Sequence, residues 1–66
     1  MEIVINGMPH QVADEMSLER AVSLISQAAS GIAAAVNGEV VRRASWPSTL
    51  LAAGDEVEVL VAVQGG

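Results

Sequence analysis

The chain has no cysteine, which excludes disulfides, thiolate metal sites and a thiol nucleophile. If the protein carries sulfur, the sulfur must therefore sit on a carboxyl carbon. It also has no phenylalanine, tyrosine or lysine, and its single tryptophan is Trp46. All three basic residues are arginines (Arg20, Arg42 and Arg43), so copies of the protein cannot be linked to one another through their own side chains.

Basic clusters and long apolar runs are also missing. The net charge is -5 and only Arg42 and Arg43 are adjacent, which argues against nucleic acid as a partner. The acidity favours solubility, or steering toward a basic enzyme surface. No apolar run approaches the ~20 residues that span a bilayer. The start, Met1-Glu2-Ile3, lacks the basic region of a signal peptide, so we expect a cytoplasmic protein without membrane partners.

What the chain does contain is a small globular domain. Its 66 residues are 52% apolar, and a chain of this size buries only about 60% of its unfolded surface. Glu2 to Asn6 predicts a strand, and Asn6-Gly7 is a strong signal for a two-residue hairpin. Met8 to Val12 would be the returning strand. We expect it at a sheet edge because Pro9 has no backbone donor.

The next segment predicts the main helix, of about three turns. Ser17 is a good N-cap. Gly31 suits the left-handed position just past the helix end. Between them, apolar residues fall on one face at helical spacing: Leu18, Ala21, Val22, Ile25, Ala28 and Ala29.

A second hairpin is expected from Ile32 to Arg42. Ile32 to Val36 is the outgoing strand, Asn37-Gly38 the tight turn and Glu39 to Arg42 the return. The alanines of the outgoing strand suggest a close neighbour.

From Arg43 to Gly54 the pattern is irregular. Leu50-Leu51-Ala52 is interpreted as one helical turn that plugs the core. Glu56 to Val63 then alternates charge and valine before becoming apolar on both faces, which is typical of a central strand.

The order ββαββ, helical turn, β predicts an α+β domain of the β-grasp, or ubiquitin-like, class. One main helix would cover one face of a four- to five-stranded mixed sheet, with the first and last strands parallel at its centre. We expect the domain to span residues 1–62 and a flexible tail to follow at 63–66.

At this level of detail the chain resembles the sulfur carrier proteins of thiamine biosynthesis. Length and element order agree along the whole chain, and a terminal diglycine after a β-grasp pattern is typical of such carriers. A close alternative is the small, sulfur-carrying subunit of molybdopterin synthase, which also ends in diglycine. The resembling stretches are Ile5-Asn6-Gly7, Val36-Asn37-Gly38-Glu39-Val40-Val41, Gly54-Asp55-Glu56-Val57-Glu58-Val59-Leu60 and Ala62-Val63-Gln64-Gly65-Gly66.

The resemblance implies a carrier that is modified by other enzymes and is not itself an enzyme. An adenylating, E1-like enzyme would use ATP to activate the Gly66 carboxylate, and sulfur from a persulfide enzyme would then leave a thiocarboxylate. Thiazole synthase would receive that sulfur for the thiazole ring of thiamine. The chain itself would bind no cofactor and no metal, because ATP belongs to the partner, and the free protein would be a monomer.

The terminal residues suit that route physically. An α-carboxyl group has a pKa of roughly 3.5, so it is ionised at neutral pH and needs activation before sulfur can attack. Gly66 presents no Cβ to the nucleotide, and Gly65 tolerates unusual φ/ψ in a narrow channel. Val63 to Gly66 reach about 13 Å when extended. The alternative is that the two glycines are a frayed end without a role.

Docking residues are expected at the base of the tail. We predict that Leu60, Val61, Val63 and Gln64 contact partners, against the alternative of ordinary core packing. Trp46 is either an interface anchor or packs on the sheet.

Charged side chains offer further contacts with a partner. Asp55, Glu56 and Glu58 could pair with partner arginines, or form a solvated strand edge. Arg42 and Arg43 could touch an acidic patch of a partner.

Other chemistry has little support in the sequence. His10 is a lone histidine without a second ligand. No phosphate loop or catalytic triad is present. A third hypothesis is a ubiquitin-like modifier or interaction module; in the latter case the diglycine would be dispensable.

Overall fold

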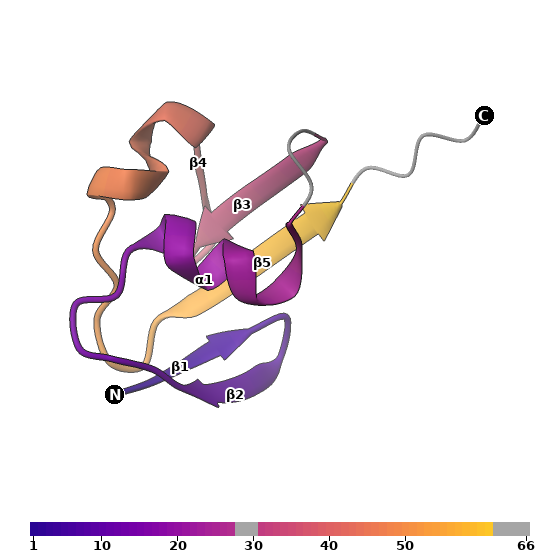
Figure 1. Cartoon of the computed structure of the whole chain (residues 1–66). Coiled ribbons are helices and arrows are strands. Elements are labelled where there is room, and N and C mark those ends of the chain that lie inside the picture. The colour runs from indigo at the N-terminus through magenta and orange to yellow at the C-terminus, as the bar shows by residue number, and fades with distance from the viewer. Residues whose placement is uncertain (28–30, 62–66) are drawn as a thin grey trace.

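The computed structural model describes residues 1–27 and 31–61 and shows an α-helix and a short 3-10 helix lying against a sheet (Figure 1). The two Asn-Gly hairpins, the α-helix and the last strand occur in the predicted order, and the strands of the hairpins end within about one residue of the expected positions. The expected end of the last strand, Val63, lies outside the described residues. The elements are β1 (Glu2–Ile5), β2 (Met8–Gln11), α1 (Leu18–Ile25), β3 (Ile32–Val36), β4 (Glu39–Val41), the 3-10 helix η1 (Arg43–Ser48) and β5 (Glu56–Val61).

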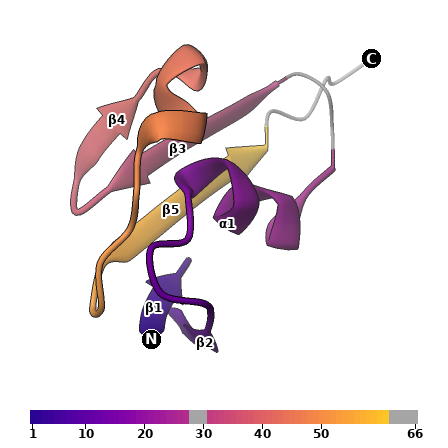
Figure 2. The ribbon, with the colours of Figure 1, turned by 60° about the vertical axis from the view of Figure 1, so that its left-hand side comes forward.

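The five strands form one mixed sheet in the order β2-β1-β5-β3-β4. β5 is central, parallel to β1 and antiparallel to β3. α1 and η1 lie on the same side of the sheet, and no element of the described residues covers the other side (Figures 1 and 2). This arrangement confirms the predicted β-grasp class, including the parallel pairing of the first and last strands.

Both Asn-Gly pairs form the predicted two-residue turns. Asn6 and Asn37 each have φ of 50°, and Gly7 and Gly38 have φ of 81° and 85°. Two successive positive φ values define the type I′ turn, whose twist matches that of paired strands. Pro9 lies on the edge strand β2, as expected from its missing donor.

The core lies between the sheet and the two helices. The strands contribute alternate residues, because successive side chains point to opposite faces. Fully burying one such Ile, Leu or Val contributes about 1.5–3 kcal/mol. The buried residues are Ile3 and Ile5 of β1, Ala34 of β3, Val57 and Val59 of β5, Leu18, Ala21 and Val22 of α1, Trp46 of η1, and Leu51.

α1 begins as predicted but ends early. The Ser17 side chain accepts a hydrogen bond from the Arg20 N–H at 3.2 Å, which is the expected N-cap. The prediction of about three turns was wrong, because the helix stops at Ile25 and Ser26 is extended. Ile25 is already 40% exposed, so the sheet offers little further burial to prolong a short helix.

The predictions for the remainder of the expected helix concern Ala28, Ala29 and Gly31. Ala28 and Ala29, which were assigned to the same helix face, lie outside the described residues. Gly31 does have a positive φ of 76°, but it directly precedes β3 instead of following the last turn of α1.

The segment before β5 also departs from the prediction. The helical turn is η1, at Arg43–Ser48, and not at Leu50-Leu51-Ala52. Trp46 of η1 is 3% exposed, and its Nε1 donates a hydrogen bond to the Val41 carbonyl at 2.9 Å. The residue by which the helical turn reaches the core is therefore Trp46, where the prediction had placed a turn of leucines. Leu51 does reach the core, but from an extended segment whose N–H bonds the Met16 carbonyl at 2.8 Å.

Candidate functional site

The predicted reactive end falls beyond the part of the chain that the structure describes. Val63, Gln64, Gly65 and Gly66 are outside the described residues, as is the boundary expected at residue 62. The structure does describe the strand that leads to them, and the two predicted contact residues on it, Leu60 and Val61, are 68% and 48% exposed. β5 is therefore the described element that lies next in sequence to the predicted reactive end.

β5 presents two different faces. Val57 and Val59 point into the core and are 1% and 4% exposed. Glu56, Glu58 and Leu60 alternate with them and are exposed, so they lie on the uncovered outer face of the sheet. Near its end the strand carries an apolar residue, Leu60, on the outer face as well, as predicted. That outer face, however, is open to solvent.

Leu60 has apolar neighbours on that outer face. Leu60 of β5 is paired with Ala33 of β3. Two residues further along β3, Ala35 is paired with Val40 of β4, on the other edge of β3. Val40 is 81% exposed. We call Ala33, Ala35, Val40 and Leu60 the outer apolar patch; together with Gly38 and Glu58 they line a shallow hollow. Because alanine side chains are short, the two alanines form the floor of the hollow, and the longer side chains of Leu60 and Val40 form its sides.

Sequence reasoning missed Val40 as part of this site. The signal was present, because a two-residue turn at Asn37-Gly38 fixes the pairing of Ala35 with Val40. Continuing the same register across β3 and β5 would have placed Leu60 on the same face.

Carboxylates flank the outer apolar patch. Glu58 lines its hollow, and Glu56 lies on the same face of β5. Asp55 differs from these two, because both of its carboxylate oxygens are used in the turn before β5. Oδ1 accepts from Asn37 Nδ2 at 3.1 Å, and Oδ2 accepts from the Ala52 N–H at 2.8 Å. Of the three acidic residues considered as partner contacts, Glu56 and Glu58 are the ones exposed for such a role.

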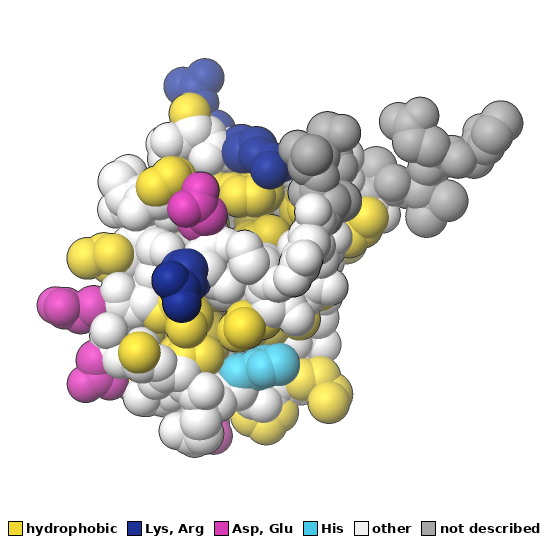
Figure 3. Space-filling view, viewed as in Figure 1, with side chains coloured by type: hydrophobic (Ala, Val, Ile, Leu, Met, Phe, Trp, Pro, Cys, Tyr) yellow, Lys and Arg dark blue, Asp and Glu magenta, His cyan; other side chains and the backbone are white. Residues whose placement is uncertain are grey.

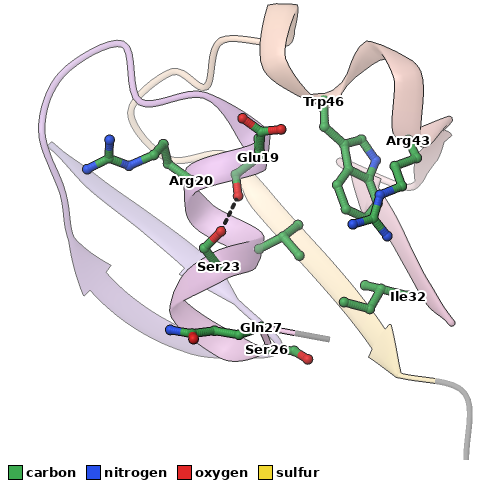
Figure 4. A pocket seen from close by; sticks show the side chains of 9 residues that line it. Glu19, Arg20, Ser23, Ser26, Gln27, Ile32, Arg43 and Trp46 are labelled. Atoms are coloured by element: carbon green, nitrogen blue, oxygen red, sulfur yellow. Dashed lines mark hydrogen bonds between the residues drawn. The ribbon is translucent and has the colours of Figure 1, made fainter. Parts of the chain in front are cut away.

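The opposite, helix-covered side carries the arginines (Figure 3). A cleft there separates α1 from η1 (Figure 4). Glu19 and Ser23 line one wall, and Arg43 and Trp46 the other. The Arg43 guanidinium lies 5.0 Å from the centroid of the Trp46 ring, within cation–π range. The cleft walls combine both signs of charge, so they do not define one class of ligand.

Trp46 is thus a core residue and not an exposed interface anchor. Its burial and its hydrogen bond to Val41 match the alternative expected from the sequence, in which the indole packs on the sheet. The Arg43 guanidinium lies over this ring, and both adjacent arginines, Arg42 and Arg43, are exposed.

Within residues 1–27 and 31–61 no group of three or more His, Asp or Glu side chains is placed to hold a metal ion. Across the same residues, no helix is both long and apolar enough to cross a membrane.

Fold and site together define the class of the protein: a small ubiquitin-like β-grasp domain whose central last strand leads to a Gly-Gly end. The chain belongs to the ThiS family, whose sequence profile matches residues 3–66. This confirms the family predicted from the motifs, and it supports a sulfur-carrier role.

Two solved structures of a thiamine biosynthesis protein from Geobacter metallireducens are similar to the chain. The crystal structure, of a protein named ThiS, is 31% identical with a TM-score of 0.81, and the match covers 100% of both chains. The NMR solution structure is 30% identical with a TM-score of 0.80, covering 100% of this chain and 88% of that one. Among curated protein sequences no match is found.

Proposed function

We propose that this protein is a sulfur carrier for thiamine biosynthesis that is modified at its own carboxyl end. The observation that carries the proposal is the match to the ThiS family through residue 66, together with the diglycine at that position. The protein is a co-substrate of partner enzymes and catalyses no step itself. We place it in the cytoplasm, free of membrane and nucleic acid.

The chemistry takes place on the carbonyl carbon of Gly66. A carboxylate oxygen attacks the α-phosphorus of ATP in the partner's site, pyrophosphate leaves and an acyl adenylate forms. The terminal sulfur of a donor persulfide then displaces AMP at the carbonyl carbon. This forms a C–S bond and gives an acyl disulfide that still contains the S–S bond of the persulfide. A thiol then attacks the donor sulfur of that S–S bond, which leaves a thiocarboxylate on Gly66 and a disulfide on the donor side. Gly65 and Gly66 offer no side chain to obstruct any of these groups.

Three partners follow from this chemistry: an adenylating E1-like enzyme, a persulfide-forming sulfur donor and thiazole synthase. The same short tail must enter more than one of their sites in turn. A carrier of this kind gains from docking contacts that lie on the rigid domain beside the tail, because these contacts orient the tail without blocking its end.

We assign the docking contacts to the outer apolar patch and to Val61, followed by Val63 and Gln64. Leu60 on β5 and Val40 on β4 are both exposed, and the alanines of β3 lie between them on the same face. A contiguous exposed apolar surface is typical of interaction sites. Glu56 and Glu58 on the same face fit a partner surface with an apolar centre and arginines at its rim.

ATP–pyrophosphate exchange tests the first step. The purified chain is mixed with the activating enzyme from the same source and labelled pyrophosphate. We expect exchange that depends on the chain and is abolished by deletion of Gly66, while the thermal melt of the deletion variant stays close to that of the full chain. Equal exchange with and without Gly66 would overturn the proposal and would favour an interaction module.

A further inference from the structure

The two hairpin asparagines both use their side chains on β5. Asn6 Oδ1 accepts a hydrogen bond from the Val59 N–H at 2.8 Å, and Asn6 Nδ2 donates to the Val59 carbonyl at 3.1 Å. Asn37 Oδ1 accepts from the Glu56 N–H at 2.9 Å, and its Nδ2 donates to Asp55 Oδ1 at 3.1 Å. The two turns have the same geometry, but their amides hold different ends of the strand.

Asn6 acts where the pairing of β1 with β5 stops. The parallel register ends at Ile5 opposite Val57, and the Asn6 N–H bonds the Val57 carbonyl at 2.9 Å. At Gly7 the main chain turns away into the hairpin, so β1 has no peptide group left for Val59. The side-chain amide of Asn6 supplies a donor and an acceptor in its place.

The consequence for β5 is one more paired residue on the β1 side. Val59 is buried and immediately precedes Leu60 and Val61, the exposed residues at the base of the tail. An unpaired backbone N–H and C=O at Val59 would be costly in this partly buried position. β3 pairs with β5 as far as Val61 on the other side, and Asn6 extends the pairing on the β1 side to Val59, so that both sides of the strand are held up to the docking surface.

We propose that Asn6 is a positioning residue for modification of the carboxyl end. By pairing with Val59 it holds Leu60 on the outer face and sets the point on the sheet from which the chain continues toward Gly66. The inference rests on the proposed carrier function. Asn6 touches no reacting atom, and its effect is exerted through β5.

Asn37 provides a matched control. Asn6→Gly and Asn37→Gly each remove one side-chain amide that makes two hydrogen bonds, and glycine keeps the positive φ that both turns need. Both changes add the same freedom to the unfolded chain. They differ in which end of β5 they release: the end next to Leu60 for Asn6, and the end at Glu56 for Asn37.

Two measurements on the full chain test the role. Amide hydrogen exchange, followed by NMR, should become roughly tenfold faster at Val59 in Asn6→Gly, as expected from the loss of about two net hydrogen bonds. In Asn37→Gly the faster exchange should appear at Glu56 instead. In the adenylation assay, Asn6→Gly should lower kcat/KM about tenfold relative to Asn37→Gly, mainly through a raised KM for the carrier.

Asn6→Asp guards against a variant that fails to fold. It keeps a favoured turn residue and the Oδ1 acceptor for the Val59 N–H, but it replaces the donor to the Val59 carbonyl with a carboxylate oxygen that repels that carbonyl. We therefore expect a folded variant whose kcat/KM falls as it does in Asn6→Gly. Equal losses in Asn6→Gly and Asn37→Gly, with an active wild type, would overturn the positioning role alone. A wild-type chain that supports no adenylation would overturn the proposed function itself.

Discussion

The inner and outer faces of the sheet use the same strands for opposite purposes. On the inner face Val57 and Val59 are 1% and 4% exposed beneath α1 and η1, whereas on the outer face Leu60 and Val40 are 68% and 81% exposed. Alternation along β5 separates the two faces residue by residue. A change on one face can therefore leave the other nearly untouched, which is useful in a domain with so small a core.

The two faces of the sheet also differ in the charged side chains that they carry. Glu56 and Glu58 share the outer face with the outer apolar patch, while the arginines are on the helix side (Figure 3). The chain carries a net charge of -5, and an acidic outer face attracts a basic partner, whereas the helix side mixes arginines with Asp and Glu side chains (Figure 3).

The largest effect is expected from the inner face. Ile5→Ala removes a side chain that is 1% exposed, and the lost burial plus the cavity should cost about 2–5 kcal/mol of unfolding free energy. The total unfolding free energy of a protein is roughly 0.05–0.15 kcal/mol per residue, so a domain this small would lose much of its stability. Urea unfolding followed by Trp46 fluorescence measures it.

The outer-face control is Val40→Ala, at 81% exposure, which should change the unfolding free energy by less than about 0.5 kcal/mol. Similar losses in the two variants would mean that the outer face also contributes to the core, and the separation of the faces would be wrong.

A second effect concerns partner binding. Leu60→Ser should leave unfolding nearly unchanged and weaken binding to the activating enzyme by about tenfold or more, because exposed apolar residues at the centre of an interface act as anchors. Leu24→Ser, on α1 and 54% exposed, is the matched change on the other side and should bind as the wild type does. Isothermal titration calorimetry would detect the difference; a larger loss for Leu24→Ser would move the docking surface to the helix side.

The smallest effect is electrostatic. Glu58→Gln should slow association with the activating enzyme severalfold at low ionic strength, and the difference should fade as salt is raised. Glu19→Gln removes the same charge from the cleft on the helix side and should have a weaker influence. Association rates measured at two salt concentrations decide this, and identical rates for both variants would show that only the net charge matters.

The sequence predicted the parts of the fold that are specified locally. Asn6-Gly7 and Asn37-Gly38 need two positive φ values in a row, and few other residue pairs accept them, so both hairpins were placed correctly. The N-cap at Ser17 was also predicted correctly, because an N-cap depends only on one side chain and on the first turn of the helix.

The errors arose where distant segments decide the structure. The end of α1 depends on how far the sheet extends beneath it, which Ile25 alone does not reveal. Trp46 and Leu51 both reach the core, with the indole bonded to the Val41 carbonyl, whereas Leu50 is 60% exposed, and no local pattern distinguishes these residues. The bond of Asn6 to Val59 joins residues 53 positions apart, so no local pattern indicates it.

The candidate site divides in the same way. Leu60 and Val61 were predicted from their place before the tail, and the structure shows both exposed. Val40 was missed because its contribution requires the register of β4, β3 and β5 to be combined. The roles of Val63, Gln64, Gly65 and Gly66 remain predictions from the resemblance and from the chemistry of a free carboxylate.

The measurement that tests the central claim most directly is the intact mass of the full chain after incubation with ATP and a sulfur donor in lysate from its own source. The account predicts a mass gain equal to the exchange of one oxygen for one sulfur, absent when Gly66 is deleted and retained in Leu24→Ser, a change on α1 outside the proposed docking surface. An unchanged mass, in a lysate shown to sulfurate a known carrier, would contradict it, and the outer face would then belong to a docking module whose diglycine has no chemical role.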